Sequence, residues 1–250
     1  MVHPQKKWGQ NLLRNKAAVE KIVAAVEPRP GEVIVEIGPG EGVLTEKLAA
    51  LGNELLAIEI DPALADRLRQ RFGDIIVNAD ALTAPLPSRP FRAVGNLPYN
   101  AGTPILRRVI ADPNFRRAVF MLQKEVADRL VARPGGEQYG FLTLYCQLFA
   151  AARILFTLEP GSFHPRPKVR SAVVLLDPDR KPYANDEVVG IISAAFRMRR
   201  KKLINNLTNL RSREEVLQLL DRAEVDPDAR AEDLPLDAFA RIAAHFRRPS

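Results

Sequence analysis

Residues 33–42 read Val-Ile-Val-Glu-Ile-Gly-Pro-Gly-Glu-Gly, a β-branched run followed at once by a glycine-rich turn. Such a run is typical of a buried parallel strand. Apolar residues with helical spacing follow from Val43 to Leu51. Strand, glycine turn and helix form the first unit of a nucleotide-binding α/β sheet, in which glycine lets the backbone pass close to a ligand. The dinucleotide fingerprint G-x-G-x-x-G is not met, because Val43 stands where its third glycine is required.

The next two predicted strands each end in an acidic residue. Residues 55–58 precede Glu59, whose carboxylate is placed to accept hydrogen bonds from both hydroxyls of a ribose; the alternative is a solvated acid at a strand end. Residues 75–77 precede Asp80, which is placed either to accept from an adenine amino group or to cap the following turn. Because ligands bind at the edge where parallel strands end, these features together predict a nucleotide site.

The fourth predicted strand, residues 91–95, leads into Asn96-Leu97-Pro98-Tyr99. The Asn96 side chain offers a carbonyl acceptor, and Pro98 holds Leu97 extended so that the Leu97 carbonyl points outward. Tyr99 adds a flat aromatic face. Two acceptors beside a stacking ring suit a planar group with an exocyclic amine, such as adenine or cytosine. A strand-ending turn with a buried Tyr99 is the alternative.

A proline-rich loop, residues 163–171, lies between two further predicted strands at residues 153–158 and 172–176, which we expect to pair antiparallel at one edge of the sheet. Its alternating prolines keep the loop extended and stiff, and three cations line it. Phe163 is interpreted as a second aromatic face opposite Tyr99, or alternatively as a core residue beneath a rigid surface loop. A fifth strand is predicted at residues 116–122, and helices at residues 103–110, 123–131 and 141–151.

The composition changes after Pro178, beyond which only helical patterns follow. The basic excess is concentrated there: residues 180–213 hold nine Lys/Arg against two Asp/Glu. The densest cluster, residues 197–202, is interpreted as a contact surface for RNA backbone phosphates. We therefore expect two domains, residues 1–180 and a helical RNA-binding domain at residues 181–250. The predicted helices span residues 187–197, 199–209, 213–221 and 236–246.

The overall composition favours a polyanionic partner, since the net charge is +7 and the isoelectric point is near 9.7. There is no apolar run of membrane-spanning length and no apolar leader at the N-terminus, so we expect a cytoplasmic protein with no membrane partner. The single cysteine, Cys146, excludes an internal disulfide and is expected to be a buried helical residue. No Cys/His spacing predicts a metal site. Nothing signals an obligate oligomer, and we expect a monomer.

The N-terminal segment mixes two cations, Lys6 and Lys7, with Trp8 and two amides. It is interpreted as a flap over a ligand or as a leader that docks its tryptophan on the core.

Together these segments resemble the KsgA (RsmA) family of small-subunit ribosomal RNA adenine dimethyltransferases. The resemblance covers nearly the whole chain: residues 9–13 are similar to the family's cofactor flap, 36–42 to its glycine loop, 96–99 to its amine-methylating motif and 163–171 to the loop that helps hold the target base. Residues 122–127 and 199–202 also resemble family segments. At the position of Leu12, phenylalanine is commoner in the family than leucine.

The resemblance implies a Rossmann-like class I methyltransferase fold, with a mostly parallel sheet of seven strands and one antiparallel edge. It implies S-adenosylmethionine as cofactor, S-adenosylhomocysteine as product, and the rRNA of immature 30S particles as partner. Cofactor contacts are then expected at Asn11, Leu13, Gly38, Gly40, Glu59, Asp80 and Asn96. The catalytic group is expected to comprise Asn96, Leu97, Pro98, Tyr99 and Phe163. RNA contacts are expected at Lys6, Lys7, Arg166, Lys168, Arg197, Arg199, Arg200, Lys201 and Lys202.

Three alternatives stay open. Macrolide-resistance methyltransferases share the glycine loop, the motif at Asn96 and the proline loop, but act on large-subunit rRNA; the segments near Gln123 and Arg199 favour the small-subunit activity. DNA adenine methylation fits less well, because the chain has no room for a large target-recognition domain. A non-catalytic ribosome-assembly factor is a different class, which the intact motif at Asn96 disfavours.

Overall fold

The structure, a computed structural model, describes residues 11–198 and 201–246. The chain divides into two compact units. The first runs to Ala127 and also includes Ala152–Pro178, whereas the second combines Asp128–Ala151 with the chain from Asp179 onward. The predicted first domain, residues 1–180, included residues 128–151. The second unit therefore takes in a segment beyond the predicted range and is discontinuous in sequence.

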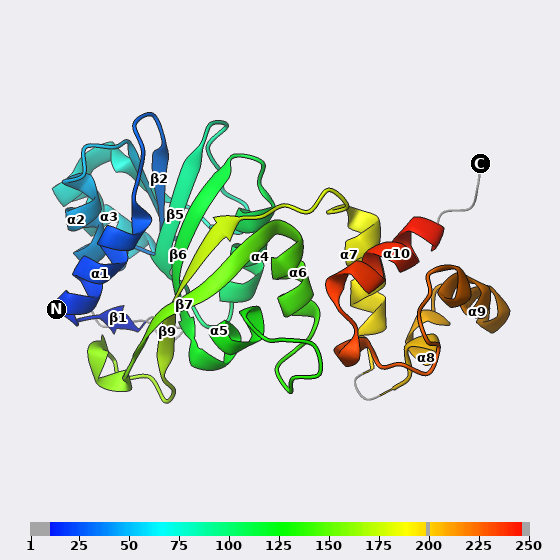
Figure 1. Cartoon of the computed structure of the whole chain (residues 1–250). Helices are drawn as coiled ribbons and strands as arrows, with labels where there is room; N and C mark the ends of the chain where they lie inside the picture. Colours follow the sequence, from blue (N-terminus) through cyan, green and yellow to red (C-terminus); the bar gives the residue numbers. More distant parts are fainter. Residues whose placement is uncertain (1–10, 199–200, 247–250) are drawn as a thin grey trace. The chain divides into compact units, whose positions relative to one another are not determined.

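The first unit is built on a seven-stranded sheet with the strand order β4-β3-β2-β5-β6-β9-β7 (Figure 1). The strands β4, β3, β2, β5 and β6 run parallel, and β9 pairs antiparallel with β6. This arrangement confirms the predicted fold class. The strands are Val33–Ile37 (β2), Leu55–Glu59 (β3), Ile76–Asn78 (β4), Phe91–Asn96 (β5), Phe115–Gln123 (β6), Ala150–Leu158 (β7) and Ser171–Pro178 (β9).

Helices cover the sheet of the first unit; Figure 1 shows α1, α2 and α3 on one face and α4 on the other. Local sequence signals start two of them. The Asn15 side chain caps α1 by accepting from the Ala18 N–H, and Asp61 caps α3 with Pro62 at its first position. The bounds are Lys16–Val26 (α1), Val43–Ala49 (α2), Pro62–Phe72 (α3) and Gly102–Ala111 (α4), with short 3₁₀ turns at Gly73–Ile75 and Pro160–Ser162.

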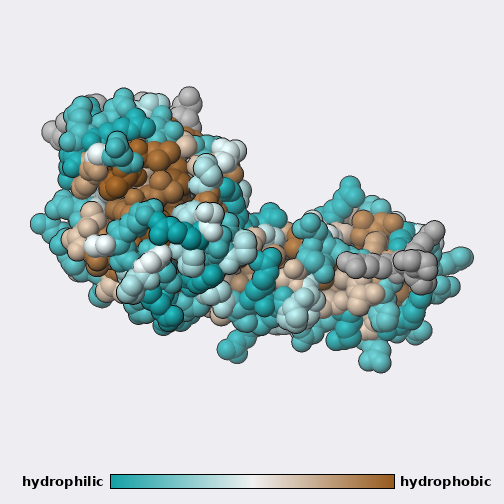
Figure 2. All heavy atoms as spheres, turned by 90° about the horizontal axis from the view of Figure 1, so that it is seen from above, coloured by the Kyte–Doolittle hydropathy of each residue, from teal (hydrophilic) through white to brown (hydrophobic). Residues whose placement is uncertain are grey.

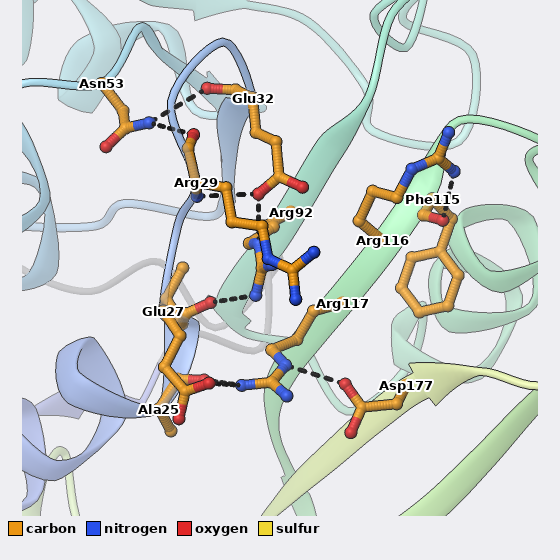
Figure 3. Close-up of polar contacts among 11 residues, drawn as sticks. Ala25, Glu27, Arg29, Glu32, Asn53, Arg92, Phe115, Arg116, Arg117 and Asp177 are labelled. Carbon is orange, nitrogen blue, oxygen red and sulfur yellow. Dashed lines mark hydrogen bonds and ion pairs between the residues drawn. The ribbon is translucent and has the colours of Figure 1, made fainter.

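A network of ion pairs joins the strands at the end of the sheet where β2, β5 and β6 begin (Figure 3). Arg92 is 5% exposed; its Nε donates to Glu32 and its Nη1 to the Val26 carbonyl at 2.9 Å. Burial opposes the ionisation of Glu32, but the bonds from Arg92 and from the Arg29 N–H prevail and hold the pKa of Glu32 below its ordinary value. Arg117 on β6 pairs in the same way with Glu27 and with Asp177. These contacts fix the turn after α1 to the sheet, at the edge opposite the predicted site.

In the part of the chain that the structure describes, the regular structure of the second unit is helical, apart from the first two residues of β7 and one β-bridge between Lys202 and Arg230. The predicted helix at residues 199–209 is wrong in length, because the helix there covers only Leu203–Leu207 (α8). The remaining helices match within a few residues. They are α5 (Lys124–Leu130), which leads into this unit, α6 (Phe141–Phe149), α7 (Asp186–Ala195), α9 (Arg213–Arg222) and α10 (Leu236–Phe246), with a 3₁₀ turn at Ala231–Asp233.

A buried amide joins α8 to the end of α7. Asn206 is 1% exposed, and its Nδ2 donates to the carbonyls of Ala195 at 2.7 Å and of Met198 at 3.1 Å. Its Oδ1 accepts from the Met198 N–H at 3.1 Å. Asn206 therefore serves as an internal clamp between α7 and α8.

Hydrophilic residues cover most of the face seen in Figure 2, with a group of hydrophobic residues in view on the first unit. Within residues 11–198 and 201–246, no helix is long and apolar enough to cross a membrane.

Candidate active site

A pocket opens where β2, β3 and β5 end, at the edge of the sheet predicted from the sequence. It encloses about 480 Å³, part of which is open to solvent. Its walls come from four separate segments, the stretch before α1, the glycine turn, the end of β3 and the motif after β5. The lining residues are Asn11, Leu12, Gly38, Gly40, Glu59, Ile60, Asn96, Leu97, Pro98 and Tyr99.

The glycine turn forms one wall because its residues carry no side chains. Gly38 and Gly40 have φ angles of +68° and +62°, which L-residues with a Cβ rarely adopt. A Cβ on Gly40 would lie 2.8 Å from Cδ2 of Leu12. The turn therefore brings its backbone close to the pocket, and substitution there would close part of the pocket.

Glu59 is held rigidly at the end of β3. It is 2% exposed; its Oε2 accepts from the Gly40 N–H at 3.1 Å and its Oε1 from the Asp61 N–H at 3.0 Å. Burial raises the pKa of Glu59, and these two backbone bonds partly offset the rise. The acid joins the glycine turn to β3 and carries acceptor oxygens into the pocket wall.

A second carboxyl, Glu36 on β2, is buried behind the glycine turn. It is 1% exposed. Burial raises the pKa of Glu36 to about 8; hydrogen bonding from Thr45 opposes the rise, and the negative charge of Glu59 adds to it. Glu36 is therefore mainly protonated at neutral pH, which avoids two buried charges side by side.

The raised pKa makes stability depend on pH through Glu36. The folded state binds the Glu36 proton more tightly than the unfolded state does, because the pKa of Glu36 is about 8 in the folded state against 4.5 in the unfolded state. Protonation of Glu36 therefore stabilises the folded state fully below pH 4.5, and this stabilisation is lost as the pH rises through 8. Glu36→Gln removes the titrating group. We expect the free energy of unfolding of the wild type, relative to this variant, to fall by about 2–3 kcal/mol between pH 5 and pH 7.

Urea unfolding at several pH values measures this difference. Glu46→Gln removes an exposed acid from α2 and is the matched control for the loss of one carboxyl group. Parallel slopes for the wild type and Glu36→Gln would contradict the prediction.

The motif after β5 is anchored by its own backbone. The Leu97 N–H donates to the Met121 carbonyl of β6 at 3.1 Å, and the Pro98 carbonyl accepts from the N–H groups of Ala101 and Gly102. The Tyr99 hydroxyl lies 3.2 Å from Oγ of Ser171, the first residue of β9. The Leu97 carbonyl accepts no hydrogen bond from the described part of the chain. This leaves the carbonyl available to a ligand.

The segment before α1 closes the pocket from the other side, and we call residues 11–14 the flap. Its strand β1 (Leu12–Leu13) pairs antiparallel with β8 (Phe163–His164), so that Leu12 faces His164 and Leu13 faces Phe163. The Arg14 N–H also donates to the Ser162 carbonyl at 2.7 Å. The Asn96 Nδ2 donates to the Asn11 carbonyl at 2.6 Å. The flap thus contacts both the proline loop and the motif at Asn96.

Most predicted cofactor and catalytic residues come together in this pocket, but three side chains do not line it. Leu13 and Phe163 are 6% and 5% exposed and pack in the hydrophobic core. The structure therefore gives no support to a Phe163 ring stacked on a target base, and among the predicted rings only Tyr99 lines the pocket. The Asp80 side chain accepts from the Leu82 N–H at 2.8 Å and so caps the following turn, which is the second of the two roles predicted for it.

The predicted RNA contacts are solvent-exposed wherever the structure describes them. Arg166, Lys168, Arg197, Lys201 and Lys202 are all exposed, and Lys202 pairs with Asp228 at 2.9 Å. Such an exposed pair contributes little to stability. The remaining predicted contacts, Lys6, Lys7, Arg199 and Arg200, lie outside the described residues.

Sequence reasoning missed Leu12 and Ile60, which line the pocket, and Ser171 as the partner of Tyr99. Leu12 could have been found from the alternation of side chains along a strand, because a buried Leu13 places the neighbouring side chain on the other face. Cys146 is buried in α6, and burial raises the pKa of its thiol to about 12, so it stays protonated. Among residues 11–198 and 201–246 no group of His, Cys, Asp or Glu could hold a metal ion.

The residues that line the pocket fit an adenosine-containing cofactor. A buried carboxylate at the end of β3 suits the two ribose hydroxyls, and the positive-φ glycines leave space that a Cβ would fill. Glu59, Gly38, Gly40 and the flap would hold such a group.

Comparisons with known proteins identify the family of the chain. The sequence profile of the family described as "Ribosomal RNA adenine dimethylase" matches residues 2–248. "Ribosomal RNA small subunit methyltransferase A" of Methylococcus capsulatus is 43% identical, with 96% of each chain covered. A solved dimethyladenosine transferase from Plasmodium falciparum superposes with a TM-score of 0.79 at 25% identity, covering 92% of this chain and 95% of that one. The 23S rRNA methyltransferase ErmE superposes with a TM-score of 0.69 at 28% identity, covering 94% and 99%. The chain belongs to the ribosomal RNA adenine dimethylase family.

Proposed function

We propose that this protein dimethylates the N6 amines of two adjacent adenines in a hairpin loop of small-subunit rRNA during ribosome assembly. The observation that carries the proposal is the arrangement at Asn96: two acceptors and an aromatic ring beside a pocket whose acid and glycines suit S-adenosylmethionine. The small-subunit relative supports the choice of RNA, because it is 43% identical to this chain, whereas ErmE is 28% identical over a similar share of it.

In the proposed reaction S-adenosylmethionine supplies an activated methyl group. The residues of the chain act on the adenine. In the first transfer Asn96 Oδ1 and the Leu97 carbonyl accept the two N6 hydrogens, which favours a pyramidal nitrogen and aims its lone pair at the methyl carbon, with S-adenosylhomocysteine as the leaving group. In the second transfer one of these two acceptors holds the single N6 hydrogen that remains. Tyr99, held by Ser171, stacks on the base at about 1–3 kcal/mol. No strong base is needed, because the methylated ammonium is acidic and releases its proton to solvent. Positioning and dipoles that face the developing positive charge are then the main contributions.

Tritium transfer from labelled cofactor tests the substrate. We expect label in immature small subunits and in no comparable amount in large subunits. Label confined to large subunits would favour the activity that the name of ErmE describes. Tight binding to small subunits without label would favour an assembly factor that does not catalyse.

The basic cluster at residues 197–202 is proposed to contact RNA phosphates. Replacing Arg199, Arg200, Lys201 and Lys202 with glutamine should weaken binding to the rRNA and make the slope of log K against log salt less negative by about 3, because each phosphate contact contributes about 0.7–0.9. Binding titrations at several salt concentrations measure the slope.

The matched control replaces four exposed cations of α2 and α3, Lys47, Arg67, Arg69 and Arg71, with the same change of net charge. An equal loss of slope in both variants would mean that only total charge matters, and would reject the assigned contact surface.

A further inference from the structure

The amide nitrogen of the Asn96 side chain is hydrogen-bonded to the flap. Its Nδ2 donates to the main-chain carbonyl of Asn11 at 2.6 Å, and both residues line the pocket. An asparagine amide is a donor at one end and an acceptor at the other. With Nδ2 turned to the flap, Oδ1 is turned away from it, and the amide presents its acceptor to a ligand beside Leu97 and Tyr99.

The opposite orientation of the same amide is nearly identical in shape but has the wrong polarity. Rotating it by half a turn would bring Oδ1 against the Asn11 carbonyl, so that two acceptors would meet with no proton between them. The amine end would then face the pocket, where it would offer a donor to an amine that is itself a donor. The Asn11 carbonyl thus discriminates between a productive and a non-productive orientation.

Asn11 is in turn held through the flap. β1 pairs with β8, the Arg14 N–H donates to the Ser162 carbonyl at 2.7 Å, and the Asn15 Nδ2 donates to Oγ of Ser162 at 3.4 Å. Leu12 packs against Gly40 of the glycine turn. The position of the Asn11 carbonyl therefore depends on the seating of the flap on β8, which begins the proline loop.

We infer that Asn11 is a positioning residue, whose main-chain carbonyl orients the Asn96 amide so that its acceptor is formed only when the flap is seated on β8. This inference rests on the proposed function, because it concerns the group that accepts from the adenine amine. It makes the flap part of the amine site as well as of the cofactor site.

A change of protonation at position 96 tests the orientation. In Asn96→Asp a carboxylate oxygen replaces Nδ2 and meets the Asn11 carbonyl without a proton, whereas the protonated carboxyl donates to that carbonyl and keeps its other oxygen as the acceptor. The rate of methyl transfer of Asn96→Asp relative to the wild type, at saturating cofactor, should rise about tenfold for each pH unit lowered while the pH exceeds the pKa of the introduced carboxyl. A ratio that is flat, or that rises with pH, would overturn the inference.

A second measurement needs no substrate. In the ¹⁵N spectrum of the wild type one proton of the Asn96 side-chain amide should be shifted and slow to exchange, as expected of a proton in a hydrogen bond. Arg14→Pro removes the N–H that donates to Ser162 and should abolish that signature, while Arg14→Ala keeps the N–H and should retain it. An unchanged Asn96 signal in folded Arg14→Pro would also overturn the inference.

The two ideas fail separately. A wild-type protein that labels no small-subunit rRNA would reject the proposed function, while the amide spectrum would still decide the orientation of Asn96. Normal labelling combined with a flat pH ratio would reject only the inference. Should Arg14→Pro not fold, the pH ratio of Asn96→Asp still decides.

Discussion

Asn96→Ala should lower the rate of methyl transfer by about 100- to 1,000-fold, the usual loss when one preorganised polar group at the reacting centre is removed. The substitution deletes the side-chain acceptor and leaves the Leu97 carbonyl, whose backbone is fixed by the bond from its N–H to Met121. The RNA affinity should change little, because the basic surface stays intact, whereas the cofactor keeps Glu59 and the glycine turn but loses the contact expected at Asn96 and the bond from Asn96 to the flap. Single-turnover kinetics with immature small subunits, with cofactor binding measured by calorimetry, separate the two effects.

Asn100→Ala is the matched control. Asn100 lies four residues further on, is exposed, and does not line the pocket. It should keep the wild-type rate. Full turnover by Asn96→Ala would refute the role of Asn96, and a parallel loss in both variants would point to disruption of the loop.

Gly95→Ala should lower the free energy of unfolding by about 3 kcal/mol or more, at the upper end of what overpacking a core usually costs. A Cβ on Gly95 would lie 2.3 Å from the main-chain oxygen of Ile37, its register partner on β2. Neither backbone can yield without separating β5 from β2 at the floor of the pocket. Because Asn96 is the next residue, we also expect the remaining folded protein to lose activity.

Gly190→Ala makes the same chemical change in α7 where nothing lies within 4 Å of the added atom. Since alanine is the better helix former, this control should gain about 0.5–1 kcal/mol. Urea unfolding measures both variants. Equal and small effects would show that the sheet accommodates a side chain at position 95.

The parallel sheet could be predicted because its strands are local signals. The β-branched run at residues 33–37 is buried along its whole length, as its composition indicates, and the glycine turn directly follows it. Glu59 and Asn96 were found for the same reason, since each stands at the end of its strand. The side chain at the carboxyl end of a parallel strand lies at the edge of the sheet, so locating the strand in the sequence also locates that side chain.

Other features depend on partners that are distant in the chain. Phe163 has the composition of a stacking residue, but its register opposite Leu13 turns it into the core. Asn206 closely follows the basic cluster in sequence, yet its amide is hydrogen-bonded to the backbone of Ala195 and Met198. The pairing of β1 with β8 joins segments about 150 residues apart, which no local pattern reports.

The discontinuity of the second unit has a consequence for how the chain is made. Tyr139, in the earlier stretch, packs edge-on against Phe196 with ring centroids 6.4 Å apart, and its hydroxyl donates to the Leu234 carbonyl at 2.8 Å. Both partners are synthesised only after β7 and β9 have completed the sheet. During translation the sheet of the first unit can therefore fold before the residues that pack against Tyr139 and α6 have been synthesised. A fragment that starts at residue 181 would have to fold with Phe196 facing no Tyr139.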